Sequence, residues 1–88
     1  MITKEVKISN AIGLHARPAT FFIQKANMYT SSIWVEKDDR KVNAKSLLGV
    51  LSLGIAKDMS VTLLADGQDE SAAVAGLIEL IDSGFSEF

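Results

Sequence analysis

The chain has 88 residues, 48% of them hydrophobic, which suits one domain spanning residues 1–88 around a single core. The formal net charge is −2 and the nine Lys and Arg residues are scattered, which argues against direct nucleic-acid binding. With no cysteine and one histidine, we expect neither disulfides nor a bound metal. No segment approaches the ~20 apolar residues of a membrane span, and the N-terminus does not read as a signal peptide, so we expect a cytoplasmic protein without membrane insertion.

The first part of the chain is predicted to form a strand followed by a helix. Apolar and polar residues alternate over residues 2–9, the period of a half-buried strand. A loop is expected over residues 10–14. The helix that follows has Pro18 in its first turn, where a missing N–H costs nothing, and is expected to end near Asn27 or Met28.

A hairpin is predicted next. Residues 32–37 read as a strand, residues 38–39 as a turn and residues 40–43 as a short third strand. The charges of residues 36–41 are mixed in sign and are interpreted as a solvated hairpin without a function.

A short helix is predicted after the hairpin, capped by the hydroxyl of Ser46 and closing near Gly54. A phosphate at such a cap would meet the helix dipole favourably and add close to two negative charges. Leu47, Leu48 and Leu51 cannot all point inward from so short a helix, which predicts an apolar docking patch for partner proteins. The residues of this helix expected in the core are Val50 and Leu53.

The last part of the chain is predicted to form a fourth strand and a third helix. The strand covers residues 61–65, and Asp66-Gly67 marks the turn out of it. Asp69 is expected to cap the helix, with Gly84 just past its end. The order βαββαβα predicts an α+β fold, a two-layer open-faced β-sandwich with a four-stranded antiparallel sheet covered on one face by helices.

The only histidine, His15, lies in the run Gly13-Leu14-His15-Ala16-Arg17-Pro18-Ala19 and is expected to cap the first helix. Its ordinary pKa of about 6.5 lies near neutrality, and helix N-termini bind anions. A phosphate on its imidazole would meet the N–H groups of Ala16 and Arg17 and the Arg17 guanidinium. A lone histidine or arginine at a helix start is more often a solvated side chain, and it is the whole heptapeptide that favours a phosphate site.

The heptapeptide around His15, together with the run from Lys45 to Gly54, resembles HPr, the histidine-containing phosphocarrier family of the bacterial sugar phosphotransferase system. The resemblance covers essentially the whole chain. It implies a carrier and not an enzyme. A phosphoryl group that originates in phosphoenolpyruvate passes from enzyme I to the family's histidine, and from there to the IIA domain of a sugar permease. No cofactor is expected, and we expect a monomer.

The resemblance also implies roles for individual residues. His15 would accept the phosphoryl group on Nδ1, and Arg17 would stabilise the phosphate. Ser46 would be the site that HPr kinase/phosphorylase modifies in low-GC Gram-positive bacteria, which slows transfer and creates a corepressor for the catabolite control protein. The residues expected to dock partner proteins are Ala16, Thr20, Leu47, Leu48 and Leu51.

Two other functions remain open at this point. One is a purely regulatory HPr paralogue that acts only through phosphorylation of Ser46. Relatives of that kind are recognised by loss of the active-site histidine, whereas His15 is present here. The other is a nitrogen-related phosphotransferase carrier, which would share the His15 chemistry and is disfavoured by the sequence around Ser46.

Overall fold

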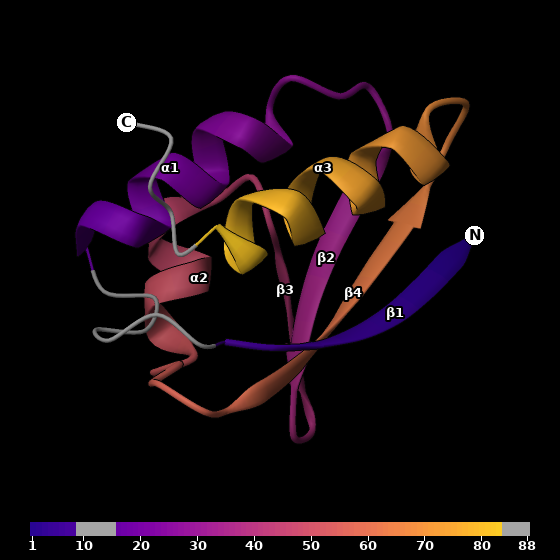
Figure 1. The fold of residues 1–88 in the computed structure, drawn as a ribbon. Helices are drawn as coiled ribbons and strands as arrows, with labels where there is room; N and C mark the ends of the chain where they lie inside the picture. The colour runs from indigo at the N-terminus through magenta and orange to yellow at the C-terminus, as the bar shows by residue number, and fades with distance from the viewer. Residues whose placement is uncertain (9–15, 84–88) are drawn as a thin grey trace.

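Four strands form one antiparallel sheet, in the order β1-β4-β2-β3 (Figure 1). The structure is a computed structural model that describes residues 1–8 and 16–83. Three helices alternate with the strands in the predicted order βαββαβα, which is confirmed. The strands are β1 (Ile2–Lys7), β2 (Ser32–Lys37), β3 (Arg40–Asn43) and β4 (Ser60–Asp66).

The helices are α1 (Ala16–Ala26), α2 (Leu47–Ser52) and α3 (Glu70–Asp82). α3 packs on β1 and β4, while α1 contacts both α2 and α3. Figure 1 shows α1 and α3 lying across the sheet, with α2 beside the start of α1. The two-layer arrangement predicted from the apolar faces of the helices is therefore confirmed.

The core lies between the sheet and the helices. In β2, Ile33 and Val35 are buried against the helices, whereas Trp34 between them points to the opposite, uncovered face. Trp34 lies directly across from Leu64 of β4 and Asn43 of β3. The largest fully buried side chains from the helices are Phe22, Val50, Leu77, Leu80 and Ile81.

Element boundaries differ slightly from the predictions. β1 ends at Lys7, although Ile8 is fully buried and its backbone still pairs with Asp58 and Met59. α1 ends at Ala26, within two residues of the predicted end. The expected strand end at Ser9 and the expected C-terminal Gly84 lie outside the described residues.

The predicted side-chain cap at Asp69 is wrong. Asp69 occupies the N-cap position of α3 but makes no capping bond. Its carboxylate instead accepts hydrogen bonds from the backbone N–H groups of Thr30 and Ser31, each at 2.9 Å, and from the Ser31 hydroxyl. The Ser31 hydroxyl, followed by the Thr30 N–H, lowers the pKa of Asp69 to about 2. A long-range tie to the start of β2 has replaced the local cap.

The turn before α3 is closed by Glu70. Its carboxylate accepts a hydrogen bond from the Gly67 N–H at 3.1 Å, which lowers the pKa of Glu70. The Met1 ammonium lies 3.2 Å from the Glu70 carboxylate and 3.6 Å from that of Asp66, and the hydrogen bond to Glu70 raises the pKa of this amino group. The amino end of the chain is thus tied to the β4–α3 turn.

Candidate functional site

The start of α1 is the expected phosphate site. His15 and the loop before it lie outside the described residues, and α1 begins at the next residue, Ala16. The side chains of Ala16 and Arg17 also lie outside the described part, so the contact of Arg17 with phosphate stays a prediction. Pro18 is buried in the first turn as expected, and Thr20 is partly exposed. The first turn has no acidic residue that would oppose an anion.

Ser46 caps α2, as predicted. Its backbone is extended and its Oγ accepts a hydrogen bond from the Gly49 N–H at 3.2 Å, while its carbonyl accepts from the Val50 N–H at 3.0 Å. A Cβ on Gly49 would come within 3.3 Å of Ser46 Oγ. A glycine three residues after the cap therefore leaves room around the hydroxyl of Ser46, a residue that is partly exposed.

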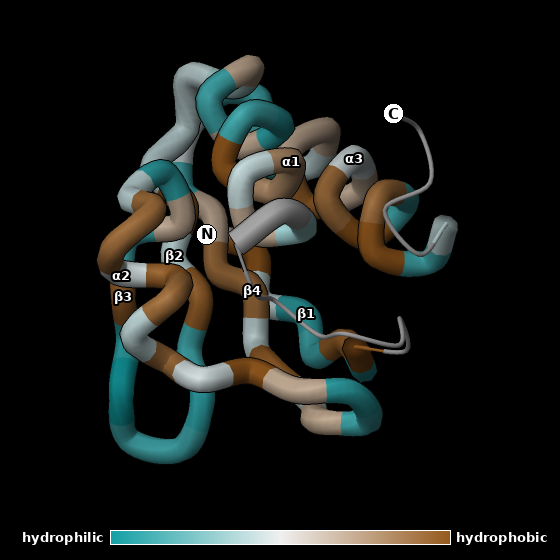
Figure 2. The backbone as a smooth tube through the Cα atoms, turned by 90° about the vertical axis from the view of Figure 1, so that its left-hand side faces the viewer, coloured by the Kyte–Doolittle hydropathy of each residue, from teal (hydrophilic) through white to brown (hydrophobic). Residues whose placement is uncertain are grey.

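Leucine side chains on α2 form a partly exposed apolar surface, the α2 patch, made of Leu47, Leu48 and Leu51. Leu47 is 41% exposed and Leu48 is 80% exposed, while Leu51 packs partly against the core. Val50 and Leu53 are buried as predicted. Figure 2 views the molecule from the side on which α2 and the start of α1 lie, and the tube of α2 is coloured hydrophobic over most of its length. Whether the patch docks partners stays a prediction.

Two cations of the β2–β3 hairpin hold the carboxyl end of α2. The Arg40 guanidinium donates hydrogen bonds to the carbonyl oxygen and the hydroxyl of Ser52, at 2.7 and 2.9 Å. Lys37 Nζ donates to the Leu53 carbonyl at 3.3 Å. Carbonyl groups at a helix end attract cations. The prediction that these hairpin charges are only solvated is therefore wrong, because two of them complete a six-residue helix.

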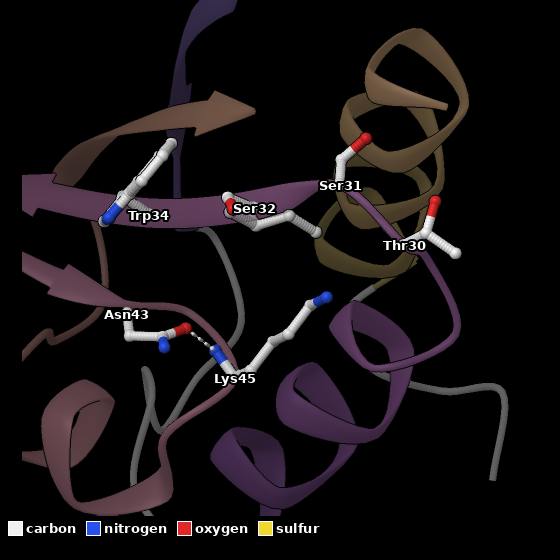
Figure 3. Close-up of a pocket in the computed structure, with 7 residues that line it drawn as sticks. Thr30, Ser31, Ser32, Trp34, Asn43 and Lys45 are labelled. Atoms are coloured by element: carbon white, nitrogen blue, oxygen red, sulfur yellow. Dashed lines mark hydrogen bonds between the residues drawn. The ribbon is translucent and has the colours of Figure 1, made fainter. Parts of the chain in front are cut away.

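A pocket of about 150 Å³ opens on the uncovered face of the sheet (Figure 3). It is lined by residues 30–34, Asn43 and Lys45. Lys45 Nζ donates to the Tyr29 carbonyl at 2.8 Å, and the Lys45 N–H donates to Asn43 Oδ1 at 2.8 Å. This pocket was not predicted from the sequence; its one visible signal there is a tryptophan on the face of β2 opposite the buried Ile33 and Val35.

The described residues contain neither a cluster of metal ligands nor a helix that could span a membrane. Within residues 1–8 and 16–83, no three His, Asp or Glu side chains gather as metal ligands would. Over the same residues, none of the helices has the length and apolar character needed to cross a membrane.

Comparison with known proteins identifies the family. The model for the PTS HPr component phosphorylation site matches residues 2–83. The HPr-like protein Crh of Halalkalibacterium halodurans is 46% identical over 82 residues, which cover 93% of this chain and 98% of that protein. The phosphocarrier protein HPr of Neisseria meningitidis is 40% identical over 87 residues, covering 99% and 98%. A crystal structure of HPr from Thermoanaerobacter tengcongensis is 49% identical, with a TM-score of 0.96 over 100% of this chain and 99% of that one.

The fold and the matched segments thus define a small protein of the phosphotransferase-system HPr type. The chain belongs to the HPr family. Its relatives include both phosphocarrier HPr proteins and HPr-like Crh proteins, so family membership alone does not assign the phosphorylated residue.

Proposed function

We propose that this chain is a phosphotransferase-system phosphocarrier that takes a phosphoryl group from enzyme I on His15 Nδ1 and passes it to IIA domains of sugar permeases. The observation that carries this proposal is the histidine itself, placed in the family heptapeptide one residue before α1 begins. The N–H groups of that helix start and the Arg17 guanidinium would hold the phosphate.

Phosphoryl transfer to and from the imidazole requires few groups of the carrier itself. The lone pair of the neutral imidazole attacks phosphorus as the bond to the donor breaks, and the reverse step delivers the group to the next acceptor. The imidazole must be accessible, and the phosphate must be stabilised without being held tightly. Site residues at the start of a surface helix meet those needs better than an enclosed pocket would.

Ser46 is proposed as a regulatory phosphorylation site. Its Oγ accepts the N–H of Gly49 in the first turn of α2, so a phosphate there can be accommodated without unfolding the helix. The added charge would lie next to Leu47 and Leu48, the most exposed residues of the α2 patch. A dianion beside a surface that docks partners is expected to weaken that docking and to create a new surface for a phosphate-reading partner.

Labelling with phosphoenolpyruvate and enzyme I tests the assignment of His15. The protein should take up one phosphate that is labile in acid and stable in base, and His15→Ala should take up none. Ser46→Ala is the matched control and should be labelled like the parent. Equal labelling of His15→Ala and the parent would disprove the assignment.

A regulatory, Crh-like function is the second candidate. It is favoured by the 46% identity to the Crh proteins of Halalkalibacterium halodurans and Bacillus subtilis. It predicts phosphorylation of Ser46 by an ATP-dependent kinase without restoration of sugar uptake in a strain that lacks its carrier. Restoration of uptake by the parent and not by His15→Ala would decide for the carrier.

A further inference from the structure

The pocket on the open face of the sheet lies apart from the proposed phosphate site at α1. Its walls come from the start of β2 and the segment before it, and from the end of β3 and the segment that joins β3 to α2 (Figure 3). The α2 patch lies on the covered side of the sheet. The pocket therefore has no role in the carrier chemistry proposed above.

One end of the pocket is cationic. The Lys45 ammonium is held by the Tyr29 carbonyl at 2.8 Å, which uses one of its three donors. Among the described residues, no carboxylate forms an ion pair with Lys45. Of the acids near the pocket, Asp66 faces the Met1 ammonium, and Asp69 accepts hydrogen bonds from the lining residues Thr30 and Ser31, so neither forms an ion pair with Lys45.

The other end of the pocket is formed by the indole of Trp34. The Lys41 ammonium lies 5.4 Å from the centre of this ring. The register places Lys41 opposite Glu36 and Asn43 opposite Trp34, so Lys41 lies toward the hairpin and the pocket lies on the other side of the tryptophan. Asn43 Oδ1 already accepts the Lys45 N–H, which leaves the Asn43 amide group as a donor at the pocket.

We propose that this pocket binds a small organic anion whose flat group packs against Trp34 and whose carboxylate or phosphate binds the Lys45 ammonium and the Asn43 amide. The volume of the pocket suits such a ligand, because a cavity of roughly 150 Å³ can hold a benzene ring. The lining agrees as well, since it combines an aromatic surface with amide, hydroxyl and ammonium donors and contributes no carboxylate. An exposed lysine alone would give only a diffuse attraction.

Nuclear magnetic resonance titration tests this binding. Trp34 is the only tryptophan, so its indole N–H gives a single resonance that reports on the pocket. Benzoate and phenyl phosphate should shift it saturably, with dissociation constants on the order of 1 mM for ligands of this size. Benzyl alcohol and inorganic phosphate, which supply the ring or the anion alone, should not saturate it below tens of millimolar. The aromatic anion that binds more tightly shows whether the pocket prefers a carboxylate or a phosphate.

Three variants locate the site. Lys45→Met and Asn43→Asp should each weaken binding of the tighter probe at least tenfold. Asn43→Asp keeps the acceptor for the Lys45 N–H and so preserves the turn. Lys57→Met is the matched control, because it has the same net charge as Lys45→Met while Lys57 is an exposed lysine outside the pocket lining, and it should change binding less than twofold. Absence of saturable shifts with both aromatic anions would overturn the proposal, as would equal losses in Lys45→Met and Lys57→Met.

Discussion

The carboxylate of Asp69 and the hydroxyl and backbone N–H of Ser31 are joined by two hydrogen bonds across 38 residues of sequence. With the further bond from Thr30, they fasten the N-terminus of α3 to the start of β2. Ser31 is also the only buried polar side chain among the described residues. This link between the start of α3 and the start of β2 thus depends on one ionised carboxylate.

The stability of the protein should depend on pH through Asp69. Its pKa is about 2 in the folded protein and about 3.9 in an unfolded chain, so folding favours the ionised form. The resulting stabilisation is complete above the unfolded value and is lost as the pH falls from about 4 through about 2. In urea unfolding at pH 7, Asp69→Asn should have a lower midpoint than the parent. That difference should shrink between pH 4 and pH 2; a constant difference over this range would contradict the prediction.

Gly67 is expected to tolerate no side chain. Its φ is +155°, and an added Cβ would lie 2.7 Å from Ser31 Cα and 2.8 Å from Ser31 Cβ. Gly67→Ala should therefore lower the free energy of unfolding by about 2–3 kcal/mol through backbone strain and displacement of Ser31. Gly54→Ala is the control, because its φ is +61° but nothing lies within 4 Å, and it should cost only about 1 kcal/mol. Equal losses for the two would show that the contact with Ser31 is unimportant.

Ser46 variants should separate capping from charge. Ser46→Ala removes the acceptor for the Gly49 N–H and should cost about 1 kcal/mol of stability with little effect on labelling by enzyme I. Ser46→Asp can keep the cap and adds a charge beside the α2 patch, so labelling of His15 should slow several-fold while stability is retained. The rate of His15 labelling is measured in reactions stopped at successive times, and stability is measured by thermal unfolding. The prediction fails if Ser46→Ala slows labelling as much as Ser46→Asp.

Leu48 should contribute to docking and not to folding. It is 80% exposed, so Leu48→Ala should change stability by no more than about 0.5 kcal/mol. If it docks enzyme I, its loss should raise the KM for transfer about tenfold. Met28→Ala is a matched control, since Met28 is 69% exposed and lies outside the patch. A similar change in KM for both variants would count against a specific docking role.

Arg40 should stabilise α2 from its carboxyl end. A six-residue helix is too short to persist on its own, so loss of the two bonds to Ser52 should favour its local opening. Arg40→Ala should lower stability by about 1 kcal/mol and speed hydrogen exchange of the α2 amides. Lys41→Ala, next to it on the hairpin, should leave α2 exchange unchanged. Unaltered exchange in Arg40→Ala would show that the core contacts of Val50 suffice.

The elements that follow from local patterns were predictable from the sequence. Alternation around Ile33 and Val35 located a strand, and the serine before Leu47 located a cap, because both depend on near neighbours along the chain. The ties that depend on distant partners were not predictable. Asp69 is a good capping residue by type, yet its carboxylate binds the segment 38 residues away, and Arg40 looked solvated until the fold brought it to Ser52.

Lys45 and Ser46 are adjacent in the chain, but one side chain closes the pocket on the open face while the other caps a helix on the covered face. Linkage makes any influence between these two positions mutual. If a phosphate on Ser46 weakens the binding of an anion at Lys45, a bound anion must oppose phosphorylation of Ser46 by the same free energy. Because Lys45 and Ser46 are neighbours in the chain, the concentration of such an anion would then influence how much of the protein is phosphorylated on Ser46.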